Sequence, residues 1–206
     1  SKYEFLKSDK SPSINVGFKP SKNFKKAFHK VPMLSLSNAF TDKDLINFEK
    51  KIRNFISLND DIKIFYSAEP KIDGISASLN YKKKKLVQGL SRGDGKEGED
   101  ITQNLLTIDD IPKEILSEDF PEDIDIRGEV FINNTDFQDI KDKFANPRNA
   151  ASGSLRQKNP ADTKKIPLKF IAYSYGYEKG LNVHYQTDFL EKLRDWGFRT
   201  NPLNKK

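Results

Sequence analysis

A regular alternation of apolar and polar residues in the middle of the chain constrains its fold more than any other feature. In the segment ISASLNY, single polar residues separate Ile75, Ala77, Leu79 and Tyr81. A period of two residues is the pattern of a strand with one buried face. The segments IKIFYSAEP, LVQGLSRGDG, DIDIRGEVFI and IPLKFIAYSYGY are predicted to be further strands.

The polar run Lys82–Lys85 lies between two of these strands and predicts the tip of a hairpin. A turn centred between Lys83 and Lys84 places the region of Gly74 opposite Gly93, within a residue or two. Two motifs that are separate in the sequence are therefore expected to be neighbours in space.

Three segments have helical patterns. TDKDLINFEKKIRNFI has apolar residues at helical spacing and a capping residue, Thr41 or Asp42. EGEDITQNLLTIDDIP predicts a short helix that ends before Pro112, and TDFLEKLRDWGF predicts one that ends at Gly197. The predicted fold class is α+β, with mainly antiparallel sheets flanked by helices.

The composition fits a globular chain with an anionic partner. A length of 206 residues, 35% of them hydrophobic, suffices for one large domain or two small ones. The net charge of +6 suits nucleic acid, although short lysine runs are also typical of a solvated face. The chain has no cysteine, no apolar stretch of membrane-span length and no signal-peptide core at its start, so we expect a cytoplasmic location and no membrane partner.

The segment EPKIDG contains the first candidate for chemistry, Lys71. A lysine becomes a nucleophile when desolvation or a neighbouring cation favours its neutral amine. The hairpin brings Arg92 near enough to be that cation. Taken alone, this short motif favours a surface lysine before a turn.

Two further motifs carry charged residues in unusual settings. SRGDGKEGED offers glycine backbone amides and Arg92, which suit a phosphate or a ribose, although a flexible hairpin exit has the same composition. RGEV places Glu129 in an apolar strand, where a carboxylate needs a partner. An internal salt bridge with Arg127 is the alternative to a functional role.

The segment FANPRNAASGSLRQ combines small residues with Arg148 and Arg156. Arginines in a closely packed backbone can contact the phosphates of a ligand or of a duplex. A tightly packed loop and helix start explains the small residues but not both arginines.

Aromatic and histidine residues give weaker signals. Tyr173, Tyr175 and Tyr177 alternate on a strand as core residues do, and one of them could stack on a base. His29 and His184 lack the spacing of metal ligands, so no metal site is predicted from them.

Taken in order, these motifs resemble the adenylation domain of bacterial NAD⁺-dependent DNA ligases. The resemblance rests on HKVPMLSLSNAF, EPKIDG, SRGDGKEGEDIT, RGEVF and FANPRNAASGSLRQ, which follow the family's pattern at compatible spacing over almost the whole chain. It implies a nucleotidyltransferase core related to the ATP-grasp-like fold of DNA ligases.

The resemblance also implies roles for individual residues. Lys71 would be the catalytic nucleophile that carries AMP, and Glu69 would recognise the adenine. The other residues implied to bind the cofactor are Ser35, Leu36, Asp73, Gly74, Arg92, Glu129 and Tyr173. Residues implied to bind DNA or phosphate are Asn146, Arg148 and Arg156.

The implied reaction uses NAD⁺ and Mg²⁺ (or Mn²⁺). Lys71 attacks the α-phosphorus, nicotinamide mononucleotide (NMN) leaves, and AMP then activates the 5′-phosphate of nicked double-stranded DNA for sealing in replication and repair. Residues 1–20 are expected to lead in from an N-terminal NMN-binding domain, and residues 21–206 to be an adenylation domain that lacks its C-terminal part.

The same resemblance implies that zinc would occur only in C-terminal modules beyond this chain. We expect a monomer that does not seal nicks by itself. Between Lys143 and Phe144 the family usually has several more residues, which predicts either a shortened loop there or residues missing from this numbering.

Two other functions remain open at this stage. An ATP-dependent polynucleotide ligase or capping-type nucleotidyltransferase would share the KxDG motif, whereas FANPRNAASGSLRQ favours the NAD⁺ branch. A non-catalytic basic module would bind a duplex with strong salt dependence and without any need for Lys71.

Overall fold

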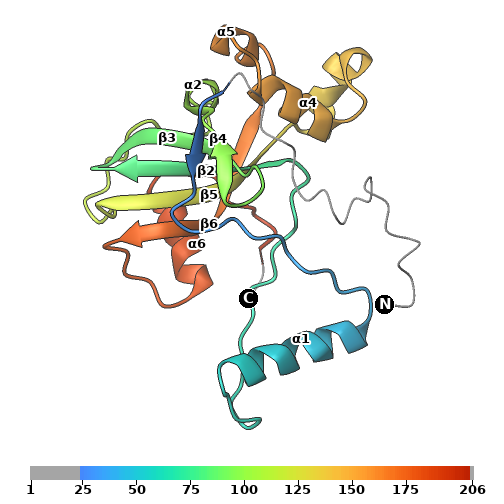
Figure 1. The fold of residues 1–206 in the computed structure, drawn as a ribbon, viewed down its shortest axis with the longest axis vertical. Coiled ribbons are helices and arrows are strands. Elements are labelled where there is room, and N and C mark those ends of the chain that lie inside the picture. Colours follow the sequence, from blue (N-terminus) through green and yellow to red (C-terminus); the bar gives the residue numbers. More distant parts are fainter. Residues whose placement is uncertain (1–23, 205–206) are drawn as a thin grey trace.

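The computed structural model of the chain describes residues 24–204 and is built around a four-stranded antiparallel sheet (Figure 1). The sheet has the order β3-β2-β5-β6. Its strands are β2 (Ile75–Lys82), β3 (Lys85–Ser91), β5 (Asp123–Phe131) and β6 (Lys169–Lys179). The mixed composition of helices and antiparallel strands confirms the coarse fold prediction. The predicted lead-in, residues 1–20, lies outside the described residues.

A second, two-stranded sheet lies across one face of the first. It pairs β1 (Lys26–Phe28) with β4 (Glu97–Glu99). Figure 1 shows both short strands in front of the larger sheet. Neither strand is predictable from the sequence, because three residues are too few to show a period.

Several helices lie around the larger sheet. In Figure 1, α2 (Thr102–Leu105), α4 (Pro147–Leu155) and α5 (Pro160–Thr163) gather near one end, and α6 (Gln186–Asp195) lies beside β6. A short helix α3 (Asn134–Phe137) continues into the 3₁₀-helix η2 (Gln138–Lys143). None of the helices in residues 24–204 has the length and hydrophobicity to cross a membrane.

The β2–β3 hairpin has the predicted turn. Lys82 pairs with Lys85, and both Lys83 and Lys84 have positive φ angles, 47° and 68°. Two positive φ angles give the turn the twist that suits a two-residue hairpin. A bulge after Asn80 shifts the register by one residue. Beyond β3, the N–H of residue 92 donates to the carbonyl of residue 76 at 3.3 Å, which confirms that the two glycine motifs are neighbours.

The hydrophobic core lies under the face of the sheet opposite β1 and β4. The fully buried Tyr81 ring contacts Phe120 and Phe198 edge to face, with centroids 5.6 and 5.7 Å away. Its hydroxyl donates to the carbonyl of Pro112 at 2.5 Å. Phe189 of α6 is also fully buried, so this C-terminal helix belongs to the core.

The helix α1 (Asp42–Phe55) is confirmed, with a capping box between Thr41 and Asp44. It buries none of its residues, and the side chain of Phe55 is 90% exposed. Figure 1 shows this helix away from the sheet. The amphipathic pattern therefore predicted the helix correctly, but the apolar residues of this helix are not part of the core.

The strand predicted in IKIFYSAEP is wrong. Residues 62–70 form no named strand, and the side chain of Phe65 is 79% exposed. The larger sheet ends at β3 on one side and β6 on the other, so this segment has no strand partner there. Instead, the carbonyl of Ile62 accepts a hydrogen bond from the Arg53 side chain at 2.9 Å, and Ala68 forms only an isolated bridge.

Candidate active site

Glu129 is the centre of the candidate site because its carboxylate is buried among polar groups. The residue is 5% exposed, and its Oε2 accepts hydrogen bonds from the Ser76 hydroxyl at 2.9 Å and the Tyr173 hydroxyl at 3.4 Å. Burial raises the pKa of Glu129, while the charges of Lys71 and Arg148 act in the opposite direction. Strand pairing of Ser76 with Glu129 fixes the first of these contacts.

Lys71 is exposed and lies just before β2. Gly74 brings this segment close to β5. A β-carbon at residue 74 would lie 2.3 Å from the carbonyl oxygen of Val130 and 2.9 Å from Cγ of Glu129. The absence of a side chain at Gly74 is therefore what lets the Lys71 segment approach the Glu129 strand.

Glu69 is tied to the other side of the site by Gln186, the first residue of α6. The Gln186 side-chain amide donates to Glu69 Oε1 and to the carbonyl of Tyr173, both at 2.8 Å. Glu69 Oε1 also accepts from Ser67 at 3.2 Å. Sequence reasoning missed Gln186, since a glutamine at a helix start carries no local signal for a partner this far away in sequence.

Tyr173 is half-buried, and burial raises its pKa to about 12, so the phenol is neutral. Of the other tyrosines on β6, Tyr175 packs edge to face on Phe189 at 4.8 Å. Tyr177 lies under the Lys30 ammonium, 4.3 Å from its ring centroid. Only Tyr173 therefore contacts the Glu129 carboxylate among these three.

Arg148 and Asp73 form an ion pair at the exposed side of the site. Their atoms Nη1 and Oδ1 are 2.9 Å apart, and the side chains are 50% and 79% exposed. Asn146 caps α4 by accepting the N–H of Asn149 at 2.7 Å. The cap and Pro147 at the helix start place Arg148 in the first turn, facing Asp73.

Arg156 ends α4 and contacts a buried carboxylate. Its Nε donates to Oε2 of Glu99 at 2.7 Å, and its Nη1 donates to Ser152 at 3.1 Å. Glu99 of β4 is fully buried. The structure thus gives Arg156 a contact that joins α4 to the two-stranded sheet, and its role toward DNA stays a prediction.

The salt bridge considered between Arg127 and Glu129 is wrong. The guanidinium of Arg127 donates instead to the carbonyls of Val31 and Pro32. These carbonyls belong to the segment after β1, which crosses this face of the sheet. A partner from a distant segment cannot be read from the local RGE sequence.

The glycine-rich turn after β3 holds Arg92 next to the segment that follows β1. The carbonyl of Arg92 accepts a hydrogen bond from Nε2 of His29 at 3.1 Å. Ser35 and Leu36 lie on the exposed continuation of the same segment. Arg92 joins this site through its main chain, while the cations that act on Glu129 are Lys71 and Arg148.

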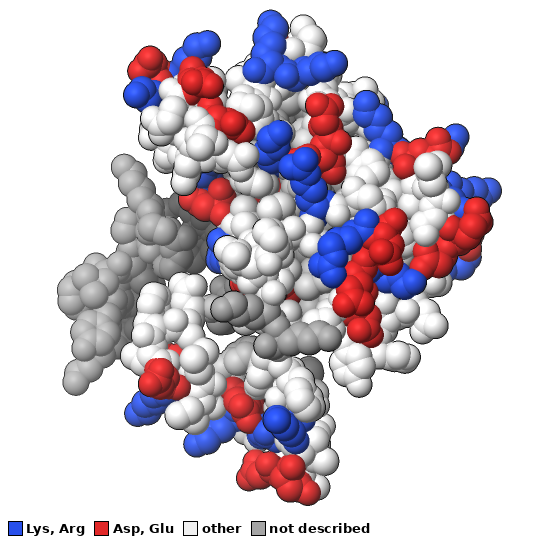
Figure 2. Space-filling view, turned by 180° about the vertical axis from the view of Figure 1, so that it is seen from behind, with Lys and Arg blue, Asp and Glu red and all other residues white. Residues whose placement is uncertain are grey.

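Within residues 24–204, no group of three His, Cys, Asp or Glu side chains is arranged to hold a metal ion. Figure 2 shows acidic and basic side chains interspersed on the rear face, so the positive net charge does not gather there in one basic patch.

A family model for the NAD-dependent DNA ligase adenylation domain matches residues 21–206. The chain belongs to this family. The relatives that the chain resembles over nearly its whole length are each named a DNA ligase.

The similarity to these DNA ligases is high. The chain is 72% identical to that of Pelagibacter ubique over 205 residues, which cover 100% of this chain and 30% of the relative. It is 46% identical to that of Parvibaculum lavamentivorans, with 98% and 30% covered. It is 44% identical to that of Xanthobacter autotrophicus, with 96% and 29% covered. The adenylation domain described here thus spans about 30% of the length of its relatives.

Proposed function

We propose that this adenylation domain uses NAD⁺ to form a covalent lysyl-AMP on Lys71. The observation that carries the proposal is the buried Glu129 carboxylate, which is influenced by the charge of Lys71 and held by Ser76 and Tyr173. Lys71 is exposed, as the short motif alone favoured, but it lies beside a buried carboxylate that Ser76 and Tyr173 hold. Family membership supports the same residue as the nucleophile.

The bond changes of this step are simple. The Lys71 amine, after losing a proton to solvent, attacks the α-phosphorus of NAD⁺. A P–N bond forms, the P–O bond of the pyrophosphate breaks, and NMN leaves with the electron pair. Negative charge develops on the phosphate oxygens, and Arg148 would stabilise that charge, together with Arg92 as the family resemblance implies.

The remaining groups fit recognition of the adenosine half. An ionised carboxylate only accepts hydrogen bonds, so Glu129 suits a ribose hydroxyl and Glu69 suits the exocyclic amine of adenine. Gln186 fixes the Glu69 carboxylate, and Tyr173 offers a neutral aromatic ring for the base. Ser35, Leu36, Asp73 and Gly74 complete the proposed nucleotide site, as the family resemblance implies.

Mg²⁺ or Mn²⁺ would accompany the nucleotide. Mg²⁺ is commonly held by one or two carboxylates and by the substrate's own phosphates, and the described residues offer no larger cluster. Among the carboxylates of the candidate site, Glu129 would be the one to contact the ion. The ion supplies positive charge to the phosphate when it is bound.

We propose nicked double-stranded DNA as the second substrate. AMP would pass from Lys71 to the 5′-phosphate of a nick, and the 3′-hydroxyl would displace it to seal the strand during replication and repair. Arg148 and Asn146, at the exposed start of α4, would contact the DNA or phosphate, and Arg156 would support them from the end of the same helix. We infer a cytoplasmic monomer.

Intact mass analysis after incubation with NAD⁺ or ATP tests this proposal in the full-length protein. A gain of one AMP from NAD⁺ alone is expected, and Lys71→Ala abolishes it. Lys63→Ala is the matched control, because Lys63 is another exposed lysine on the same irregular segment. A gain from ATP only would instead favour an ATP-dependent nucleotidyltransferase, and duplex binding without any adduct would favour a non-catalytic module.

A further inference from the structure

The segment His29–Met33, called the strap from here on, crosses the face of the larger sheet that carries Glu129. It follows β1 and leads to Ser35 and Leu36 (Figure 1). Met33 is its one buried residue, and Val31 is 38% exposed. Met33 therefore anchors one end of the strap by hydrophobic burial, and the other strap residues are held mainly by polar contacts.

One set of contacts joins the strap to the glycine-rich turn. The N–H of His29 donates to the carbonyl of Lys96 at 2.9 Å, and the N–H of Met33 donates to the carbonyl of Gly95 at 2.8 Å. The His29 ring donates from Nε2 to the carbonyl of Arg92, because a carbonyl can only accept. Three hydrogen bonds therefore join the strap to the Arg92 turn.

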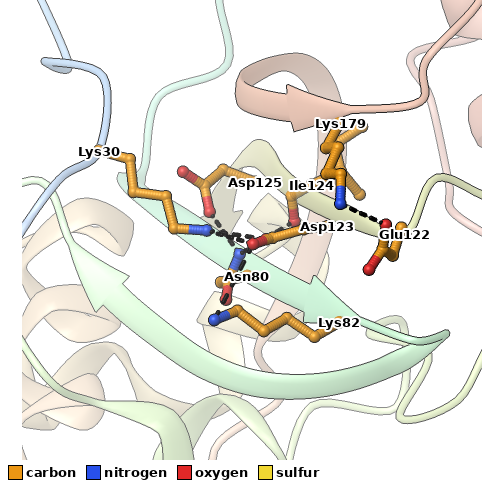
Figure 3. Close-up of polar contacts among 8 residues, drawn as sticks. All are labelled: Lys30, Asn80, Lys82, Glu122, Asp123, Ile124, Asp125 and Lys179. Carbon is orange, nitrogen blue, oxygen red and sulfur yellow. Dashed lines mark hydrogen bonds and ion pairs between the residues drawn. The ribbon is translucent and has the colours of Figure 1, made fainter.

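A second contact joins the strap to β5 through Lys30. Its ammonium donates to both carboxylate oxygens of Asp123 at 2.8 Å and lies over the ring of Tyr177. Figure 3 shows Lys30 reaching from the strap to Asp123, which also accepts a hydrogen bond from Asn80 at 2.8 Å. Asp123 is thus held by the sheet itself and is a firm anchor for a lysine from outside it.

A third contact comes from Arg127, whose guanidinium holds the carbonyls of two successive strap residues, Val31 and Pro32. Gly176 on β6 makes room for it. A β-carbon at residue 176 would lie 2.6 Å from Nη2 and 2.8 Å from Nε of Arg127. The flat guanidinium therefore lies directly on the glycine backbone, and a side chain there would displace it.

We propose that Lys30 and Arg127 are positioning residues, which clamp the strap to β5 and thereby fix Ser35 and Leu36 at the nucleotide. Ser35 lies two residues after Met33, so it stays within about 7 Å of that anchor even in an extended chain. The clamp thus acts on the binding of the adenosine half rather than on the attack by Lys71. The inference rests on the proposed function, which assigns Ser35 and Leu36 to the nucleotide site.

Lys30→Met and Lys82→Met form a matched pair for the test. Both lysines face the carboxylate of Asp123, with Nζ–O distances of 2.8 and 3.9 Å, and both are partly exposed. Only Lys30 belongs to the strap, since Lys82 lies on β2, so the pair separates loss of the clamp from loss of a charge beside Asp123.

The measurement is single-turnover adenylation over a range of NAD⁺ concentrations in the full-length protein. Lys30→Met should raise the half-saturating NAD⁺ concentration about three- to tenfold and leave the maximal rate within about twofold. Lys30→Arg should restore most of the affinity, and Lys82→Met should stay within about twofold of the wild type. Equal effects of the two methionine variants, or a lower maximal rate with unchanged affinity, would overturn the clamp.

Gly176→Ala tests the contact of Arg127 with the strap independently of Lys30. The clash involves the end of a flexible side chain, so the chain should fold normally while the guanidinium moves off Val31 and Pro32. We expect the same loss of NAD⁺ affinity as in Arg127→Lys, which keeps the charge but loses the two-carbonyl geometry. Wild-type affinity in both variants would show that Arg127 does not position the strap.

Amide hydrogen exchange distinguishes failure of the clamp from failure of the proposed lysyl-AMP chemistry. The amides of His29 and Met33 should exchange faster in Lys30→Met and Arg127→Lys than in the wild type or Lys82→Met, with or without nucleotide. Faster exchange together with an AMP adduct that survives Lys71→Ala would support the clamp while refuting the proposed nucleophile. Unchanged exchange would refute the clamp even if Lys71 is adenylated.

Discussion

Gly74→Ala is expected to impair adenylation by pushing the Lys71 segment away from β5. The new β-carbon would lie 2.3 Å from the carbonyl oxygen of Val130, whereas such contacts do not occur below 3.0 Å, so a gap of about 0.7 Å must open. The atom to be displaced is strand backbone, which does not move without disturbing its pairing. Overpacking of this kind typically costs about 1–3 kcal/mol of unfolding free energy.

The catalytic effect should be larger than the effect on stability. A shift approaching 1 Å between reacting groups can reduce a rate by about 100-fold, so we expect a loss of about 10- to 100-fold in the single-turnover adenylation rate at saturating NAD⁺. Urea unfolding measures the stability change on the same samples.

The matched control is Gly153→Ala, inside α4. There the new β-carbon would be 3.7 Å from the ring of Phe144, which is an ordinary contact. The unfolding free energy of this variant should rise by about 0.5–1 kcal/mol, because alanine favours a helix more than glycine does. A wild-type adenylation rate in Gly74→Ala would refute the view that close backbone approach at Gly74 sets the position of Lys71.

Three further predictions concern single side chains. Glu129→Gln should raise the unfolding free energy at pH 8 while reducing adenylation. Burial raises the folded pKa of Glu129, so its ionised form destabilises the fold. Denaturation at several pH values should show that the stability difference between the variant and the wild type shrinks as the pH falls through that pKa. Arg148→Gln should change the unfolding free energy by less than about 0.5 kcal/mol in urea titrations, because its ion pair with Asp73 is exposed, yet it should slow adenylation measured by mass analysis. Tyr81→Phe should cost about 1–3 kcal/mol in the same titrations, because it leaves the carbonyl of Pro112 without its buried donor, and an unchanged midpoint would contradict this.

The parts of the fold that were predictable from sequence are those with a local period. The alternation in ISASLNY and in DIDIRGEVFI predicted β2 and β5, and the polar run between two strands predicted the β2–β3 turn. The same alternation misled in IKIFYSAEP, because a strand also needs a neighbour, and that depends on the order of the whole sheet.

The candidate site divides in a similar way. Lys71, Glu129 and Arg148 stand in recognisable motifs, and the structure places their charges together. Gln186 and the two carbonyls bound by Arg127 were not predictable, because each contact joins residues about a hundred positions apart in the sequence. Such pairings depend on tertiary packing, which the local sequence pattern does not indicate.

The hydrogen bond from Gln186 to Glu69 has a consequence for synthesis of the protein. Its two partners are 117 residues apart in the chain. At about 5–20 residues per second, a ribosome needs roughly 6–23 s to add Gln186 after Glu69. During that interval Lys71 has already been made, but the carboxylate beside it lacks the amide that orients it, so nascent chains should not bind the nucleotide until α6 has left the ribosome and docked.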